Sequence, residues 1–266
     1  MVLCISLPMF LQKILSIKTM RKVPEITVYF WIIKLLTTAM GESTSDFMVH
    51  HLDPVIAVII GFVGFAIVIV LQFWVRKYVV WIYWLAVTMV AIFGTMAADV
   101  VHIVLGVPYL VSTICFAIAL TTIFFVWHKV EKTLSIHIIT NPKRELFYWL
   151  AIITTFALGT ATGDMTAITL NLGYLASGIL FAVVFMLPLV ARKAFKAHGV
   201  FTFWAAYVVT RPFGASFADW FGRTPDLGGI GFGTGRTSIV LTILIISFVG
   251  YLAITKKDSK NKQQES

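Results

Sequence analysis

FYWLAIITTFALGTATGDM, residues 147–165, contains the pattern that decides the fold of this chain. After an aromatic–Trp pair, glycine follows the tryptophan by ten residues, a small residue comes four residues later, and aspartate comes next. The same spacing recurs without a gap in three other stretches: KVPEITVYFWIIKLLTTAMGESTSDF (22–47), YWLAVTMVAIFGTMAADVVH (83–102) and FWAAYVVTRPFGASFADWFG (203–222). Four gapless copies indicate one structural unit repeated four times.

The composition indicates that this unit lies in a membrane. The 266 residues are 59% hydrophobic and 12% charged, whereas soluble domains carry about 25% charged residues. Lipid must therefore cover much of the apolar surface. Backbone groups in lipid need partners within the protein, which restricts spanning segments to helices or a closed barrel. The apolar runs reach the roughly 20 residues of a membrane helix, which favours helices over a barrel.

Each unit is expected to hold one patterned span and one plainer return span, so that all copies share one orientation. The predicted fold is an all-α integral membrane protein with about eight transmembrane helices, arranged as four parallel two-helix repeats. The expected spans are 25–47, 54–75, 80–104, 107–128, 146–169, 172–191, 201–221 and 237–255. The expected segments are repeats 23–76, 77–130, 145–197 and 198–255, a cytoplasmic loop 131–144 and a disordered cytoplasmic tail 256–266.

Lysine and arginine are distributed unequally between the two sides of this arrangement. Of the 21 in the chain, 17 lie on the side of the two termini, two lie on the other side, and two lie inside predicted spans. Basic loops stay in the cytoplasm, so both termini are expected there, in a bacterial inner membrane. The net charge of +9 is therefore interpreted as a topology signal, and no nucleic-acid partner is expected.

Residues 1–22 hold an apolar stretch whose charges lie mostly after it, unlike a signal peptide. Two interpretations remain open: an amphipathic segment in the membrane interface, or an extension upstream of a working start at Met20. The second is slightly favoured.

The tryptophans and glycines of the pattern have structural interpretations. The tryptophans are expected near the cytoplasmic surface, where they would anchor the helices in the membrane interface: Trp31, Trp84, Trp149 and Trp204. The glycines begin small-xxx-small ridges, which allow helices to approach closely: Gly41, Gly94, Gly159 and Gly214.

The aspartates indicate function. Charge within a span is costly, and it usually faces a bundle interior or a wet cavity. The four aspartates are expected in the outer half of the bundle: Asp46, Asp99, Asp164 and Asp219. One turn earlier the chain has Glu42, Thr95 and Thr160 on a similar helix face. Arg211 is expected to neutralise part of this negative charge, whereas Lys34, near the inner end of its helix, is expected to snorkel.

These motifs resemble the bacterial membrane-protein family that is defined by four tandem copies of a two-helix "repeat of unknown function". Its members are described as uncharacterised membrane-anchored proteins. The resemblance covers residues 22–255. It implies the architecture described above and no particular activity.

Two functions follow from the aspartates. The first is a transporter or channel for a small solute, either a cation or a solute coupled to protons, since carboxylate and hydroxyl oxygens bind hard cations and carboxylates carry protons. The second is a non-transport scaffold or accessory subunit, in which the aspartates hydrogen-bond between helices. No nucleophile, metal-ligand or nucleotide motif stands out. We therefore expect no enzyme activity and no cofactor, with lipid and a small solute as the partners.

Overall fold

The computed structural model describes residues 21–259. These residues form eight α-helices, with no strand among them, which confirms the all-α prediction. The helices are α2 (Val28–His51), α3 (Pro54–Trp74), α4 (Val80–Asp99), α5 (Tyr109–Glu131), α6 (Pro142–Asp164), α7 (Tyr174–Phe195), α8 (Gly199–Gly222) and α9 (Thr234–Thr255). The predictions for the segment before Met20 lie outside the described residues.

Helix starts follow local capping chemistry. The Asp53 side chain accepts hydrogen bonds from the backbone amides of Val55 (2.9 Å) and Ile56 (3.2 Å), just before Pro54 opens α3. In the same way the Asn141 side chain accepts from the amide of residue 144 at 2.8 Å. The fifth predicted span therefore begins as α6 at residue 142, four residues earlier than expected. Hydropathy alone misses this Asn-Pro start, because the residues that follow it are charged.

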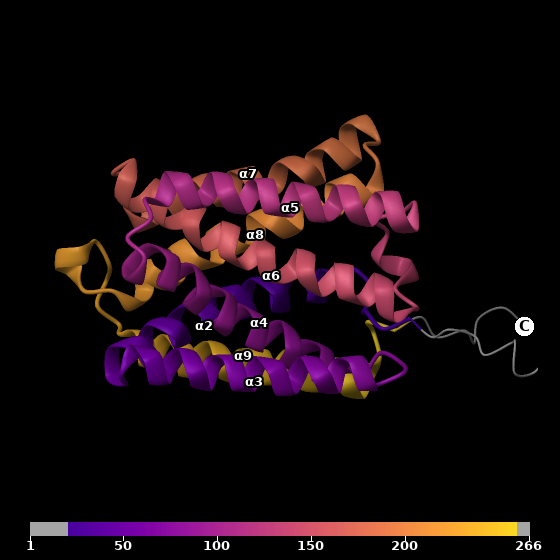
Figure 1. Cartoon of the computed structure of the whole chain (residues 1–266), viewed down its shortest axis with the longest axis horizontal. Helices are drawn as coiled ribbons and strands as arrows, with labels where there is room; N and C mark the ends of the chain where they lie inside the picture. The colour runs from indigo at the N-terminus through magenta and orange to yellow at the C-terminus, as the bar shows by residue number, and fades with distance from the viewer. Residues whose placement is uncertain (1–20, 260–266) are drawn as a thin grey trace, which may run out of the picture.

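The patterned helices form an inner ring. Each of α2, α4, α6 and α8 packs against the next, and α8 packs back against α2. The return helices lie outside this ring, with α3 on α4, α5 on α6, α7 on α8 and α9 on α2. In Figure 1 the four inner helices accordingly lie between the pair α5 and α7 and the pair α3 and α9. The last repeat thus closes onto the first.

The repeated glycines sit at the contacts of this ring. A Cβ atom on Gly41 would lie 2.5 Å from the Cβ of Ala91, and one on Gly94 would lie 2.8 Å from the Cβ of Phe156. The glycines of α6 and α8 make the same kind of contact, Gly159 with Arg211 and Gly214 with Thr38. Each glycine therefore meets the residue three positions before the next repeat's glycine, which agrees with the packing role predicted from the sequence.

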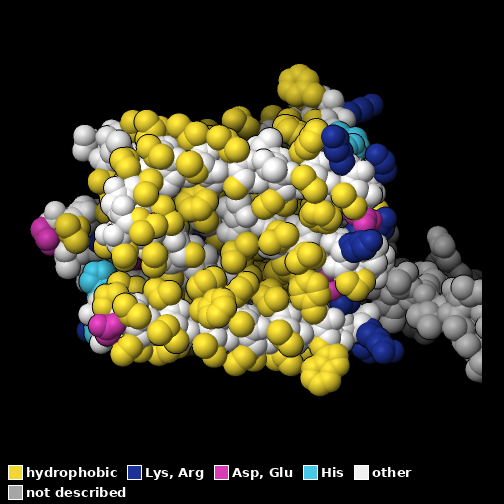
Figure 2. All heavy atoms as spheres, in the orientation of Figure 1, with side chains coloured by type: hydrophobic (Ala, Val, Ile, Leu, Met, Phe, Trp, Pro, Cys, Tyr) yellow, Lys and Arg dark blue, Asp and Glu magenta, His cyan; other side chains and the backbone are white. Residues whose placement is uncertain are grey.

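The outer surface of the bundle is apolar. Six of the described helices (α3, α5, α7, α9, and α4 and α6 with the short π-helical turns that follow them) are long and apolar enough to cross a membrane. Large side chains on α3, such as Val55, Ile59 and Trp74, are more than half exposed. Figure 2 shows hydrophobic atoms over the middle of the molecule and lysine and arginine gathered at one end, called the basic end below. The chain is a multi-pass membrane protein with internal repeats.

The segment that follows α9 is partly packed. The Asp258 side chain is buried and accepts a hydrogen bond from the Tyr78 hydroxyl at 2.5 Å. Its backbone oxygen accepts from the Glu25 amide at 2.8 Å. These contacts hold residues 256–259, the first part of the predicted disordered tail, against the basic end. The rest of that tail lies outside the described residues.

Candidate functional site

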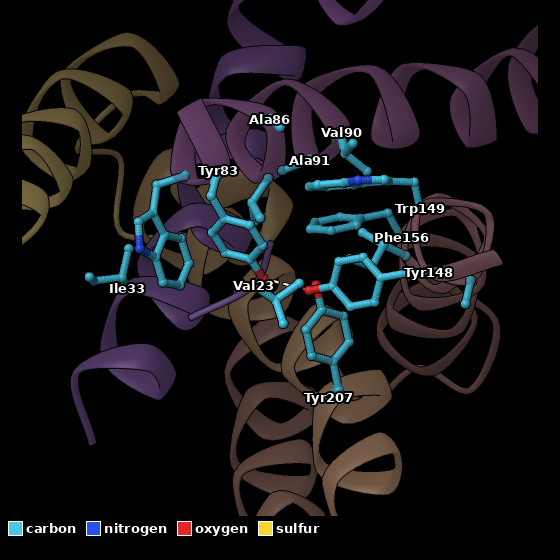
Figure 3. Close-up of a cluster of buried hydrophobic side chains, with 14 of the residues drawn as sticks. Val23, Ile33, Tyr83, Ala86, Val90, Ala91, Tyr148, Trp149, Phe156 and Tyr207 are labelled. Carbon is cyan, nitrogen blue, oxygen red and sulfur yellow. Dashed lines mark hydrogen bonds between the residues drawn. The ribbon is translucent and has the colours of Figure 1, made fainter. Parts of the chain in front are cut away.

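Buried aromatic rings fill the ring of inner helices toward the basic end. The hydroxyls of Tyr83 and Tyr148 are 2.5 Å apart and hydrogen-bonded, with Tyr207 from α8 directed toward the same point in Figure 3. The hydrogen bond joins α4 to α6, and the Tyr207 hydroxyl has no hydrogen-bond partner among the described residues.

Three of the four repeat tryptophans belong to this aromatic core. Trp84, Trp149 and Trp204 are at most 5% exposed. Their placement differs from the predicted interface anchors, because each ring packs on other aromatic rings. The fourth, Trp31, is half-buried against Phe185 and Phe203.

Arg211 lies at the middle of the bundle and is fully buried. Its Nη2 atom donates to the carboxylate of Glu42 and to the hydroxyls of Thr95 and Thr160, the last at 2.7 Å. These three acceptors come from α2, α4 and α6, so the single arginine joins all four inner helices. We call this group, Arg211 with Glu42, Thr95 and Thr160, the arginine layer. Of the predicted set of carboxylates, Arg211 thus pairs with Glu42.

The register of the repeat explains why these groups meet. Glu42, Thr95 and Thr160 each directly follow the packing glycine of their repeat, so the close helix contact brings them to the same height. The two threonine hydroxyls donate to their own helix backbone, Thr95 to Ala91 at 2.9 Å and Thr160 to Phe156 at 3.1 Å. Their oxygens are therefore oriented to accept from the arginine.

The four aspartates come together one turn further from the basic end. Asp99 lies near enough to Asp46 and Asp164 to interact with them electrostatically. Asp219 interacts with the same two aspartates. Arg223, which follows α8, contacts Asp46 at 3.1 Å and Asp219 at 2.9 Å. We call the four aspartates with Arg223 the aspartate layer. From the sequence, Arg223 is only one of the two basic residues on the side opposite the termini, and no local motif indicates its role.

Three carboxylates of the arginine and aspartate layers also have the spacing of a metal site. One oxygen each of Glu42, Asp46 and Asp219 lies within 4.8 Å of the others. All three carboxylates already pair with an arginine, namely Arg211 or Arg223. Their spacing suits a hard cation, but each of the three carboxylates is already partly neutralised by an arginine.

Asp99 and Asp164 differ from the other two aspartates. Neither has a hydrogen bond or an ion pair with another residue in the described part of the chain. Each is followed at once by a short π-helical turn, η1 (Val100–Val104) or η3 (Met165–Thr169). Such turns are rare and are often found at functional sites. These two carboxylates are therefore the free acidic groups of the aspartate layer.

Lys34 contradicts the expectation that it snorkels. Its side chain is fully buried, and its Nζ atom lies 4.0 Å from the ring centre of Phe156 and 4.3 Å from that of Tyr207. It cannot reach solvent because the aromatic core separates it from the basic end. No sequence pattern indicates this burial, since a lysine near a helix end usually reaches the interface.

A second buried charge cluster lies at the basic end. The Lys22 ammonium pairs with Glu145 at 2.5 Å, and the Gln72 amide donates to the same carboxylate at 3.2 Å. In the sequence, Lys22 counts only as a topology signal, because its partner lies more than a hundred residues away.

Two cavities also lie toward the basic end. One of about 620 Å³ lies beside Trp31 and Arg192, and one of about 800 Å³ lies beside Phe124 and Lys132. The residues that line them belong neither to the arginine layer nor to the aspartate layer. The cavities are therefore separate from the candidate site.

The two-helix unit that the fold repeats four times corresponds to a known protein family. The model of the Repeat of Unknown Function (DUF347) matches four times, at residues 29–78, 82–133, 147–197 and 202–258. The chain belongs to the DUF347 family. Each match covers one patterned helix and its return helix, so the DUF347 repeat is the two-helix unit seen in the fold. No curated protein and no solved structure matches the chain.

Proposed function

We propose that this DUF347 protein is a transporter for a small solute, coupled to the movement of a proton or another cation. One observation carries the proposal: ionisable groups line the axis of a bundle whose outside is apolar. Membrane proteins rarely keep such groups unless they serve an ion or substrate pathway. The aspartate layer would accept the cation or proton, and Asp99 and Asp164 are its free acceptors among the described residues.

The membrane orientation forms part of this proposal. All eight helices would cross the bilayer, including α2 and α8, whose buried charges would face the axis instead of lipid. The concentration of lysine and arginine at one end supports a cytoplasmic location for that end and for both termini. The membrane would be the bacterial inner membrane. The aspartate layer would then open toward the outside.

The arginine layer would act as the closed gate of this pathway. Arg211 occupies the axis and binds three helices at once. A solute can pass only if Arg211 leaves Glu42, and a proton arriving on Glu42 would weaken that ion pair. Protonation would thus be coupled to opening. We further propose that the protein has no enzyme activity of its own.

Proteoliposomes test the proposal. Purified protein should dissipate an imposed proton or sodium gradient faster than empty liposomes, read by internal pyranine and by ²²Na uptake. The double substitution Asp99→Asn and Asp164→Asn should reduce the rate to that of empty liposomes. Asp226→Asn, in the exposed loop after α8, is the matched control and should retain the full rate. Equal flux through the double variant and the wild type would contradict the proposal.

The alternative is a scaffold or accessory subunit without transport. The bridge from Arg223 to Asp46 and Asp219 favours it, because this bridge fastens α8 to α2. In that case the aspartate variants should lower the unfolding temperature in detergent, and neither gradient should decay faster with wild-type protein than without it.

A further inference from the structure

Lys34 and Arg211 leave buried hydrogen-bond donors without partners. The Lys34 Nζ atom and the Nε and Nη1 atoms of Arg211 have no hydrogen-bond partner among the described residues. Both side chains are fully buried. Buried polar groups nearly always have partners, and an unpaired buried charge is far more costly than an unpaired neutral group. Three such donors on two neighbouring cations therefore require an explanation.

The two cations gather at one aromatic ring. The Lys34 Nζ atom lies 4.0 Å and the Arg211 Cζ atom lies 5.5 Å from the ring centre of Phe156. Within residues 21–259, the only carboxylate paired with either of them is that of Glu42, which binds Arg211. With both cations charged, this level of the bundle holds two positive charges and, apart from the aspartate layer one turn away, the single negative charge of Glu42.

The repeats show that these cations are departures from a common pattern. Lys34 lies seven residues before its packing glycine, where the other repeats have Val87, Ile152 and Tyr207. Arg211 lies three residues before its glycine, where the others have Thr38, Ala91 and Phe156. All of these equivalent residues are fully buried. The equivalent positions of the other repeats thus hold buried, uncharged side chains, and only the first and fourth repeats carry a charge there.

We propose that a small monovalent anion binds between Lys34 and Arg211, next to the ring of Phe156. A single negative charge balances the excess, and an oxygen or halide can accept from the three free donors. The enclosed surroundings restrict the ligand to the size of chloride or of a carboxylate group such as formate. If the proposed transport function also holds, this anion is its cargo, and the aspartate layer supplies the accompanying protons.

Binding of ³⁶Cl to purified protein in neutral detergent tests the site, at constant ionic strength with gluconate as the replacement anion. Wild-type protein should bind about one chloride per chain. Lys34→Met should weaken binding at least tenfold, whereas Lys77→Met, an exposed lysine at the basic end, should bind like the wild type. Competition by formate distinguishes the two classes of ligand, halide and carboxylate. Strong competition with ³⁶Cl indicates a carboxylate ligand, and no competition indicates a halide.

A crystal grown with bromide gives a second test that needs no variant. An anomalous peak should lie within contact of the Lys34 Nζ atom. The proposal is overturned if the wild type shows no saturable chloride binding, if Lys34→Met binds chloride unchanged, or if bromide is absent from this position. Chloride binding without any decay of a proton or sodium gradient would keep the site and reject the proposed transport.

Discussion

Arg211 shows how one residue can join four repeats. At its position the other repeats have Thr38, Ala91 and Phe156, so the arginine breaks the repeat symmetry. Its Nη2 atom binds one group from each of the other three inner helices. Within the described residues, the charge of Glu42 is balanced only by this contact. Removing one partner of a buried ion pair leaves an uncompensated charge, which is more harmful than removing both.

Arg211→Met should therefore destabilise the protein by about 3–5 kcal/mol. The double substitution Arg211→Met with Glu42→Gln should be clearly more stable than Arg211→Met alone, because the Glu42 carboxylate is then no longer left as an unpaired charge. The measurement is thermal or denaturant unfolding in a neutral detergent. A double variant as unstable as the sum of the two single variants would contradict the account, since the two effects would then be independent.

At the scale of the elements, the packing glycines set the distance between inner helices. Gly41 faces the backbone of Ala91, whose carbonyl carbon would lie 2.8 Å from an added Cβ atom. Gly163, four residues after Gly159 on α6, has no described neighbour closer than 3.8 Å to such an atom. Both glycines belong to small-xxx-small motifs, but only Gly41 lies at a tight helix contact.

Gly41→Ala should separate α2 from α4 and destabilise the protein by about 1–3 kcal/mol, the usual cost of overpacking. Gly163→Ala is the matched control and should be neutral or slightly stabilising, since alanine favours the helix. Unfolding temperatures of the two variants in the same detergent make the comparison. Equal losses would show that the packing geometry does not decide the effect.

The segment after α9 predicts a dependence on pH. Burial raises the pKa of the Asp258 carboxyl, which the hydrogen bond from Tyr78 lowers only in part. A raised pKa in the folded state means that the stability contributed by this group is present at low pH. It is lost as the pH rises from about 4, the ordinary value, through the folded pKa.

The unfolding temperature of the wild type should therefore fall relative to Asp258→Asn as the pH rises through that range. Asparagine stays neutral, and its oxygen can still accept from the Tyr78 hydroxyl. The difference between the two proteins, followed from acidic to neutral pH, isolates this residue from other titrating groups. A difference that does not change with pH, or one that changes in the opposite direction, would reject this role of Asp258.

At the scale of the whole molecule, the sequence predicts the repeat, the eight helices and the helix face that carries the aspartates. These follow from local spacing. The partners of the charged residues do not: Arg211 and Glu42 are 169 residues apart, and Arg223 lies in a loop with no motif. Burial of Lys34 and of three tryptophans also depends on ring closure, because an open row of repeats would expose the same side chains.

Closure of the ring is the central claim, and a cysteine cross-link tests it most directly. The hydroxyls of Thr44 on α2 and Ser238 on α9 are 2.5 Å apart. In a chain whose Cys4 and Cys115 are replaced by serine, Thr44→Cys with Ser238→Cys should form a disulfide under mild oxidation. After cleavage at a protease site inserted between α5 and α6, the two halves should stay linked until reduced. Thr44→Cys with Ser247→Cys, further along α9, should release two fragments. Free fragments from the first pair would contradict the closed ring.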